Sequence, residues 1–140
     1  MNKTELALQL FSEKYSCAQS VLMAFAEDYG LSREKAANVA GAFGGGISHL
    51  GLSCGAVTGA LMVLGLKYGG TPEMKEETYT IARELVSRFN GLHGSINCTE
   101  LVGYDLSDPD QIAKARELGV FGIKCSRYVE TAVHILEELL

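Results

Sequence analysis

The pattern of apolar and polar positions predicts helices along nearly the whole chain. Apolar side chains recur at intervals of three and four residues, as they do on the buried face of an α-helix. Residues that commonly cap helices precede these segments, and glycines follow several of them. The predicted helices cover the following ranges: 3–13, 17–29, 33–43, 54–67, 72–90, 98–102, 109–118 and 125–140.

No segment of the chain predicts a β-sheet. The best candidate strand, residues 120–123, is too short to found one. The chain has 140 residues, of which 47% are apolar, and this is enough to build the core of one domain. The sequence therefore predicts a single all-α domain over residues 1–140, a helical bundle of six to eight helices.

Two glycines in the predicted helix over 54–67 indicate close helix packing. Gly55 and Gly59 lie four residues apart, on one face of that helix. Small residues at this spacing allow the backbone of a second helix to approach closely. We therefore expect this helix to lie at the centre of the bundle.

The chain shows no sign of membrane insertion or nucleic-acid binding. Its beginning lacks the basic and apolar regions of a signal peptide. The apolar stretch over 56–66 is shorter than the ~20 residues that a membrane span requires. The net charge is −5, the basic residues are scattered, and tryptophan is absent, so a nucleic-acid partner is not expected. We expect a cytoplasmic protein.

Four cysteines carry the strongest chemical signal in the sequence. Cys17, Cys54, Cys98 and Cys125 are each predicted to lie in the first turn of a helix. The first three follow a residue that commonly caps helices, whereas Cys125 follows Lys124. A helix start presents unpaired amides and a partial positive charge, which stabilise a thiolate and lower its pKa. We therefore expect the four helix starts to converge on one pocket that holds reactive sulfurs.

Three functions are compatible with these cysteines. The first is thiol–disulfide or electron-transfer chemistry, as in a thiol–disulfide oxidoreductase, with Cys54 as the best candidate nucleophile and another cysteine resolving it. The second is a metal site, holding an iron–sulfur cluster or zinc on the same four ligands. The third is a non-catalytic helical interaction module with inert thiols. No two cysteines form the close pairs of zinc ribbons or common ferredoxins.

The order of the cysteines resembles a known family. Residues 54–59 read Cys-Gly-Ala-x-x-Gly, with Cys17 before them and Cys98 and Cys125 after them. This order, the chain length and the triple glycine over 44–46 resemble the C_GCAxxG_C_C family of redox-active proteins. The resemblance implies redox activity without naming a substrate. A similar four-cysteine unit has been suggested to hold an iron–sulfur centre in a related cytochrome, and this resemblance makes a cluster the alternative.

Other polar residues near the cysteines are weaker candidates. The backbone of Gly44, Gly45 and Gly46 could cradle an anionic cofactor or donate to cysteine sulfur. Loop or surface positions are expected for His49 and His93, and His134 is expected to face away from the cysteines. Glu100 is expected to stabilise a helix start. The redox partner cannot be named, and the apolar residues near the C-terminus are compatible with a homodimer.

Overall fold

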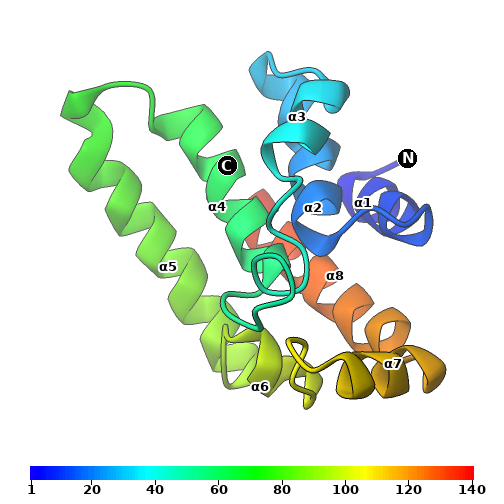
Figure 1. Ribbon diagram of the computed structural model, residues 1–140. Helices are drawn as coiled ribbons and strands as arrows, with labels where there is room; N and C mark the ends of the chain where they lie inside the picture. The colour runs from blue at the N-terminus through cyan, green and yellow to red at the C-terminus, as the bar shows by residue number, and fades with distance from the viewer.

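The computed structural model describes residues 1–140 as an all-α domain of eight α-helices (Figure 1). This confirms the predicted fold class. The helices have the following bounds: α1 Lys3–Ser12, α2 Cys17–Ala26, α3 Arg33–Val39, α4 Gly55–Tyr68, α5 Lys75–His93, α6 Cys98–Val102, α7 Pro109–Glu117 and α8 Ser126–Leu139. Short 3-10 turns over Glu27–Tyr29 and Pro72–Met74 follow α2 and precede α5, and a π turn over Phe121–Cys125 leads into α8.

Local capping explains where several helices begin. The side chains of Asn2, Ser16, Ser32, Asn97 and Asp108 each accept a hydrogen bond from a backbone amide in the first turn of the helix that follows. Ser16 and Gln19 form a reciprocal capping box. These starts agree with the sequence-based expectation because a cap depends on residues only two or three positions apart.

Four expected boundaries differ from the structure. The helix predicted over 33–43 ends at Val39, and the chain then turns through the glycine loop. Thr71 makes no capping hydrogen bond, and Pro72 opens a 3-10 turn instead of an α-helix. Helix α5 runs past Gly91 to His93 and ends at Gly94, which adopts a left-handed conformation. The expected connector over 119–124 is wrong, because residues 121–124 belong to the π turn over Phe121–Cys125.

The core lies between α2, α4 and α8, with α1 and α5 packed against them (Figure 1). Leu22, Leu64, Val133 and Leu136 are almost completely buried there. Gly59 explains the close contact of α2 and α4: a Cβ atom at this position would lie 2.6 Å from the carbonyl oxygen of Ala18. This confirms the expected close packing and identifies α2 as the partner of the glycine face.

No helix is both long and apolar enough to span a bilayer. The C-terminal residues Leu139 and Leu140 pack against the core of their own chain. The carbonyl group of Leu139 also accepts a hydrogen bond from the hydroxyl of Tyr68, at 2.8 Å. These two residues therefore give no support to the predicted homodimer, and the oligomeric state stays a prediction.

Candidate functional site

A short antiparallel bridge brings the starts of α4 and α6 together. Ser53 and Asn97, which precede Cys54 and Cys98, pair in an isolated β-bridge. The amide of Cys54 donates to the carbonyl of Ile96, and the amide of Cys98 donates to that of Leu52. The register of these bonds holds Cys54 and Cys98 in adjacent chain segments, although they are far apart in the sequence.

Helix α2 brings Cys17 to the same place. Gly55, the first residue of α4, faces the first turn of α2: a Cβ atom on Gly55 would lie 2.9 Å from the amide nitrogen of Ala18 and 3.2 Å from the Cβ atom of Cys17. Only glycine allows so close an approach. The Cys-Gly sequence at 54–55 thus places one cysteine and makes room for another.

The expectation for Cys125 is only half right. Cys125 lines the same pocket, but it is the last residue of the π turn, and the backbone is helical on both sides of it. It therefore does not occupy a free helix start. The side chain of Lys124 donates to the carbonyl of Val102, and the hydroxyl of Tyr128 donates to the carbonyl of Leu101. These two bonds fasten the Cys125 segment to α6.

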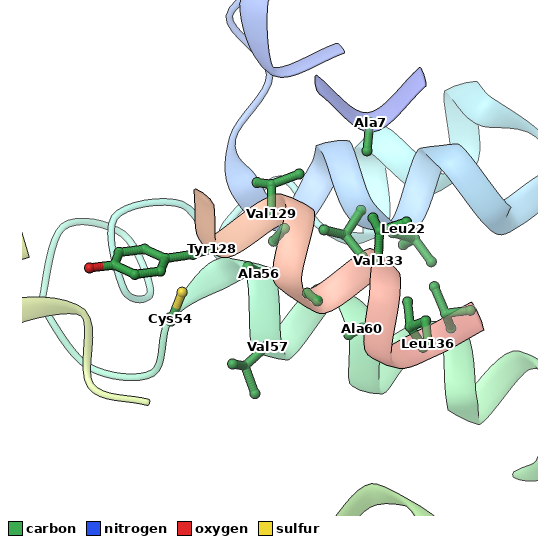
Figure 2. Close-up of a cluster of buried hydrophobic side chains, with 14 of the residues drawn as sticks. Ala7, Leu22, Cys54, Ala56, Val57, Ala60, Tyr128, Val129, Val133 and Leu136 are labelled. Atoms are coloured by element: carbon green, nitrogen blue, oxygen red, sulfur yellow. The ribbon is translucent and has the colours of Figure 1, made fainter. Parts of the chain in front are cut away.

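All four cysteines line one cavity of about 510 Å³. Cys54, Cys98 and Cys125 are buried, whereas Cys17 is partly exposed, and all four are free thiols. The structure thus confirms that the sulfurs share one pocket. Figure 2 shows the sulfur of Cys54 beside the ring of Tyr128, at the end of the buried cluster.

Burial reverses the pKa change expected for Cys54 and Cys98. Desolvation raises the pKa of Cys54 to about 11, even though hydrogen bonds from the amides of Ala56 and Val57 lower it. Desolvation, together with the negative charges of Cys54 and Cys125, raises the pKa of Cys98 to about 12. The effect of the helix start is present but smaller than the cost of burying a charge. Cys54 is therefore a poor nucleophile near neutral pH, contrary to the expectation.

Cys17 and Cys125 form a hydrogen-bonded pair. The bond raises the pKa of Cys17 well above its ordinary value, and burial and the other three cysteines raise it further. The same bond, aided by the charge of Lys124, lowers the pKa of Cys125. Of the four cysteines, Cys125 alone has a lowered pKa, and Cys17 alone is a partly exposed residue.

The triple glycine also lines the pocket. The five residues from Gly45 to His49 all have a positive φ. Three of them are not glycine: Ile47 (66°), Ser48 (50°) and His49 (63°). Such a run is strained, because each non-glycine residue in the left-handed region costs about 1 kcal/mol or more. Gly46 passes directly over Cys98: a Cβ atom there would lie 2.6 Å from the Cβ atom of Cys98. The pKa values of the four cysteines are not shifted by hydrogen bonds from Gly44, Gly45 or Gly46.

The histidines and Glu100 take other places. His49 is exposed at the rim of the pocket. His93 lies on α5, not in a loop, where its ring hydrogen-bonds to Thr131 and packs against Tyr128. His134 is exposed on α8. The carboxylate of Glu100 accepts a hydrogen bond from the hydroxyl of Ser95 in the loop before α6, where it stabilises local structure.

Three pocket residues were not anticipated from the sequence. Tyr128 follows Cys125 by three positions and so lies on the same face of its helix, a spacing that could have indicated it. Lys14 and Arg116 reach the pocket from the turn after α1 and from α7. No sequence signal connects these two residues with the cysteines, because they come together only through the packing of distant segments.

The arrangement does not form a site for a single metal ion. No three side chains among the cysteines, histidines and carboxylates are placed to hold one ion together. A tetrahedral zinc site with bonds of about 2.3 Å requires its sulfurs about 3.8 Å apart. The predicted zinc site therefore does not fit this arrangement, whereas a cluster of several atoms spans a wider set of ligands.

Comparison with known proteins agrees with this geometry. The profile of the family C_GCAxxG_C_C, described as "Putative redox-active protein", matches residues 15–139, a range that contains all four cysteines. An uncharacterized protein of Archaeoglobus fulgidus is 30% identical over 144 residues, covering 94% of this chain and 91% of its own. No solved structure matches the chain. The chain thus belongs to the C_GCAxxG_C_C family, whose members are described as redox-active.

Proposed function

We propose that the protein is a thiol–disulfide redox protein whose reactive pair is Cys17 and Cys125. The observation that carries this proposal is that Cys17 and Cys125 line one pocket and interact through their side chains, an interaction that lowers the pKa of Cys125. Thiol–disulfide exchange requires a thiolate to attack and a good thiolate to leave. The pair supplies both, with opposite roles in the two directions of the reaction.

When a partner reduces the protein, the oxidised protein starts with a Cys17–Cys125 disulfide. A partner thiolate attacks the sulfur of Cys17, because Cys17 is the one cysteine of the four whose residue is not fully buried. The S–S bond breaks, and Cys125 leaves as the thiolate that its surroundings stabilise. A second partner thiol then releases Cys17 as a thiol, and the partner becomes a disulfide. Two electrons pass from the partner to the protein.

Cys54 and Cys98 have a supporting role in this scheme. Their raised pKa values keep them protonated and neutral near neutral pH. Neutral thiols at these two positions add no negative charge to the pocket beside Cys125. Replacing either by serine is therefore expected to leave the Cys17–Cys125 couple in place.

The experiment is a redox titration of the purified protein with counting of free thiols. We expect one two-electron couple that consumes two of the four thiols. Cys17→Ser and Cys125→Ser each abolish this couple, whereas Cys54→Ser, the matched control, retains it. Loss of the couple in all of the variants alike, or four thiols that stay reduced throughout, contradicts the proposal.

An iron–sulfur protein is the second candidate, favoured by the convergence of four cysteines on one cavity. Cys17, Cys54, Cys98 and Cys125 would hold the cluster, which would supply one-electron transfer. A cationic centre would also relieve the mutual repulsion that raises the thiol pKa values. Anaerobic purification, iron analysis and an absorption spectrum test this candidate. If it holds, replacing any one of the four cysteines weakens iron retention, which distinguishes it from the disulfide scheme.

A further inference from the structure

The charge around the cysteine pocket is opposite to that of the whole chain. The chain carries 17 acidic and 12 basic residues, for a net charge of −5. The pocket lining nevertheless contains Lys14, Arg116 and His49 and no aspartate or glutamate. A cavity with this lining favours an anion over a cation.

The two cations of the pocket are not neutralised by the protein. Lys3, Arg33 and Arg88 each form an ion pair with a carboxylate elsewhere on the chain. Lys14 and Arg116 form none, and they come from separate segments that meet at the pocket.

The glycine loop supplies uncharged donors to the same cavity. The amides of Gly44, Gly45 and Gly46 find no acceptor within the protein, although all three residues line the pocket and Gly46 is buried. Unpaired buried amides are rare in native proteins. Successive amides next to residues in the left-handed conformation form a concave donor surface that suits carboxylate or phosphate oxygens.

The cavity is also large enough for a molecule rather than for the thiols alone. Its volume of about 510 Å³ lies within the range of ligand sites, roughly 300–1,000 Å³. The four cysteines, Lys14, Arg116 and the glycine loop all line this one cavity. A ligand that contacts both the cysteines and the two cations needs a sulfur and a negative charge.

We propose that the pocket binds a small organic disulfide that carries carboxylate groups, with a carboxylate at Lys14, Arg116 and the Gly44–Gly46 amides and a sulfur against Cys17. This inference rests on the proposed function and names the substrate class of the same site. It adds a binding role for Lys14, Arg116 and the glycine loop, which the redox chemistry itself does not require.

The reaction with such a disulfide, R–S–S–R, is balanced. The sulfur of Cys17 attacks one sulfur of the ligand while its proton passes to Cys125, the ligand S–S bond breaks, and R–S⁻ leaves. Cys125 then returns that proton to the departing R–S⁻ and attacks the sulfur of Cys17. The second R–S⁻ leaves as the Cys17–Cys125 bond forms. The ligand is reduced by two electrons to R–SH and R–S⁻, and the cysteine pair is oxidised.

The test compares three disulfides of similar size that differ in charge: 3,3′-dithiodipropionate, which is anionic, cystamine, which is cationic, and 2-hydroxyethyl disulfide, which is neutral. The rate at which each disulfide oxidises the reduced full-length protein is measured. Each rate is divided by the rate at which the same disulfide oxidises free dithiothreitol, which corrects for its intrinsic reactivity. We expect the anionic reagent to be favoured over the cationic one by about tenfold or more, with the preference falling as salt is added.

Charge variants locate the effect. Lys14→Gln and Arg116→Gln are each expected to lower the ratio of the rate with the anionic reagent to the rate with the neutral reagent severalfold. Lys114→Gln is the matched control, because it removes the same charge from α7 at an exposed position outside the pocket. Equal relative rates for all three reagents, or faster reaction of the cationic one, overturn this inference alone. Failure of all three to oxidise Cys17 and Cys125 overturns the proposed function, and the inference with it.

Discussion

The two ends of the α2–α4 pair show how one scaffold serves stability and chemistry separately. At the first turns, Cys17 and Cys54 border an open cavity of about 510 Å³. Further along the same helices, Leu22 and Leu64 are 1% and 0% exposed and are packed among apolar side chains. Figure 2 shows both regions, with Cys54 and Tyr128 at one end and Leu22, Val133 and Leu136 towards the other.

The difference between the packed end and the pocket end of the α2–α4 pair indicates which residues stabilise the fold and which can react. Buried thiols, strained loop residues and unpaired amides all make the folded state less stable, so they lower the free energy of unfolding. Burial of large aliphatic side chains along the same helices offsets these costs. Changes at the packed end should therefore alter stability and leave the chemistry of the folded protein intact. Changes at the pocket end should do the reverse.

The largest expected effect is on stability at the packed end. Leu136 is fully buried on α8, so Leu136→Ala leaves a void that the rigid helices cannot close. We expect the free energy of unfolding to fall by about 2–5 kcal/mol, measured by urea denaturation. The folded fraction should retain the two-electron couple at an unchanged potential. A shifted potential would show that the two regions are not independent.

A smaller loss is expected where the two regions meet. Gly59→Ala forces a Cβ atom against the carbonyl of Ala18, and we expect a loss of about 1–3 kcal/mol. Gly65→Ala on the same helix is the control, because nothing lies within 4 Å of its added Cβ atom. That change should stabilise the protein by about 0.5–1 kcal/mol, since alanine favours a helix over glycine. Equal effects of the two changes would contradict the glycine contact.

The raised thiol pKa values predict a loss of stability in alkali. Cys54 and Cys98 hold their protons more tightly in the folded state, with pKa values of about 11 and 12, than in the unfolded state, near 9.0. Their contribution is therefore complete below pH 9 and is lost as the pH rises from about 9 to 12. Unfolding by urea across this range should show a smaller decline in Cys54→Ala and Cys98→Ala than in the unchanged protein. Equal slopes would contradict the burial of these thiols.

The smallest effects concern the thiolate of Cys125. Its lowered pKa depends mainly on the hydrogen bond from Cys17 and less on Lys124. Cys17→Ala should raise the pKa of Cys125 most, and Lys124→Gln should raise it less, as followed by the ultraviolet absorbance of the thiolate against pH. A larger shift in Lys124→Gln than in Cys17→Ala would show that charge, rather than the thiol pair, stabilises the thiolate.

Local features of the fold could be predicted from the sequence, because they depend on neighbouring residues. The caps at Ser16, Ser32 and Asn97 act within one helical turn. The spacing of Gly55 and Gly59 likewise indicated a close helix contact, although not the identity of the partner helix. The π turn before α8 was missed because no local signal distinguishes it from a short connector.

The properties of the site depend on segments that are distant in the sequence. The Ser53–Asn97 bridge and the Cys17–Cys125 pair form only after the helices pack. Burial decides the sign of the pKa shifts of Cys54 and Cys98, and burial is set by neighbours from several segments. The prediction from helix starts alone included the smaller, stabilising effect and omitted the larger cost of desolvation.

Peptide mapping of the oxidised protein tests the central claim most directly. The folded, reduced protein is oxidised with a limiting amount of a small disulfide, its free thiols are blocked, and its cross-linked peptides are identified by mass spectrometry. The account predicts a single link between Cys17 and Cys125, with Cys54 and Cys98 recovered as blocked thiols. A link between Cys54 and Cys98, or a mixture of all pairings, would contradict it.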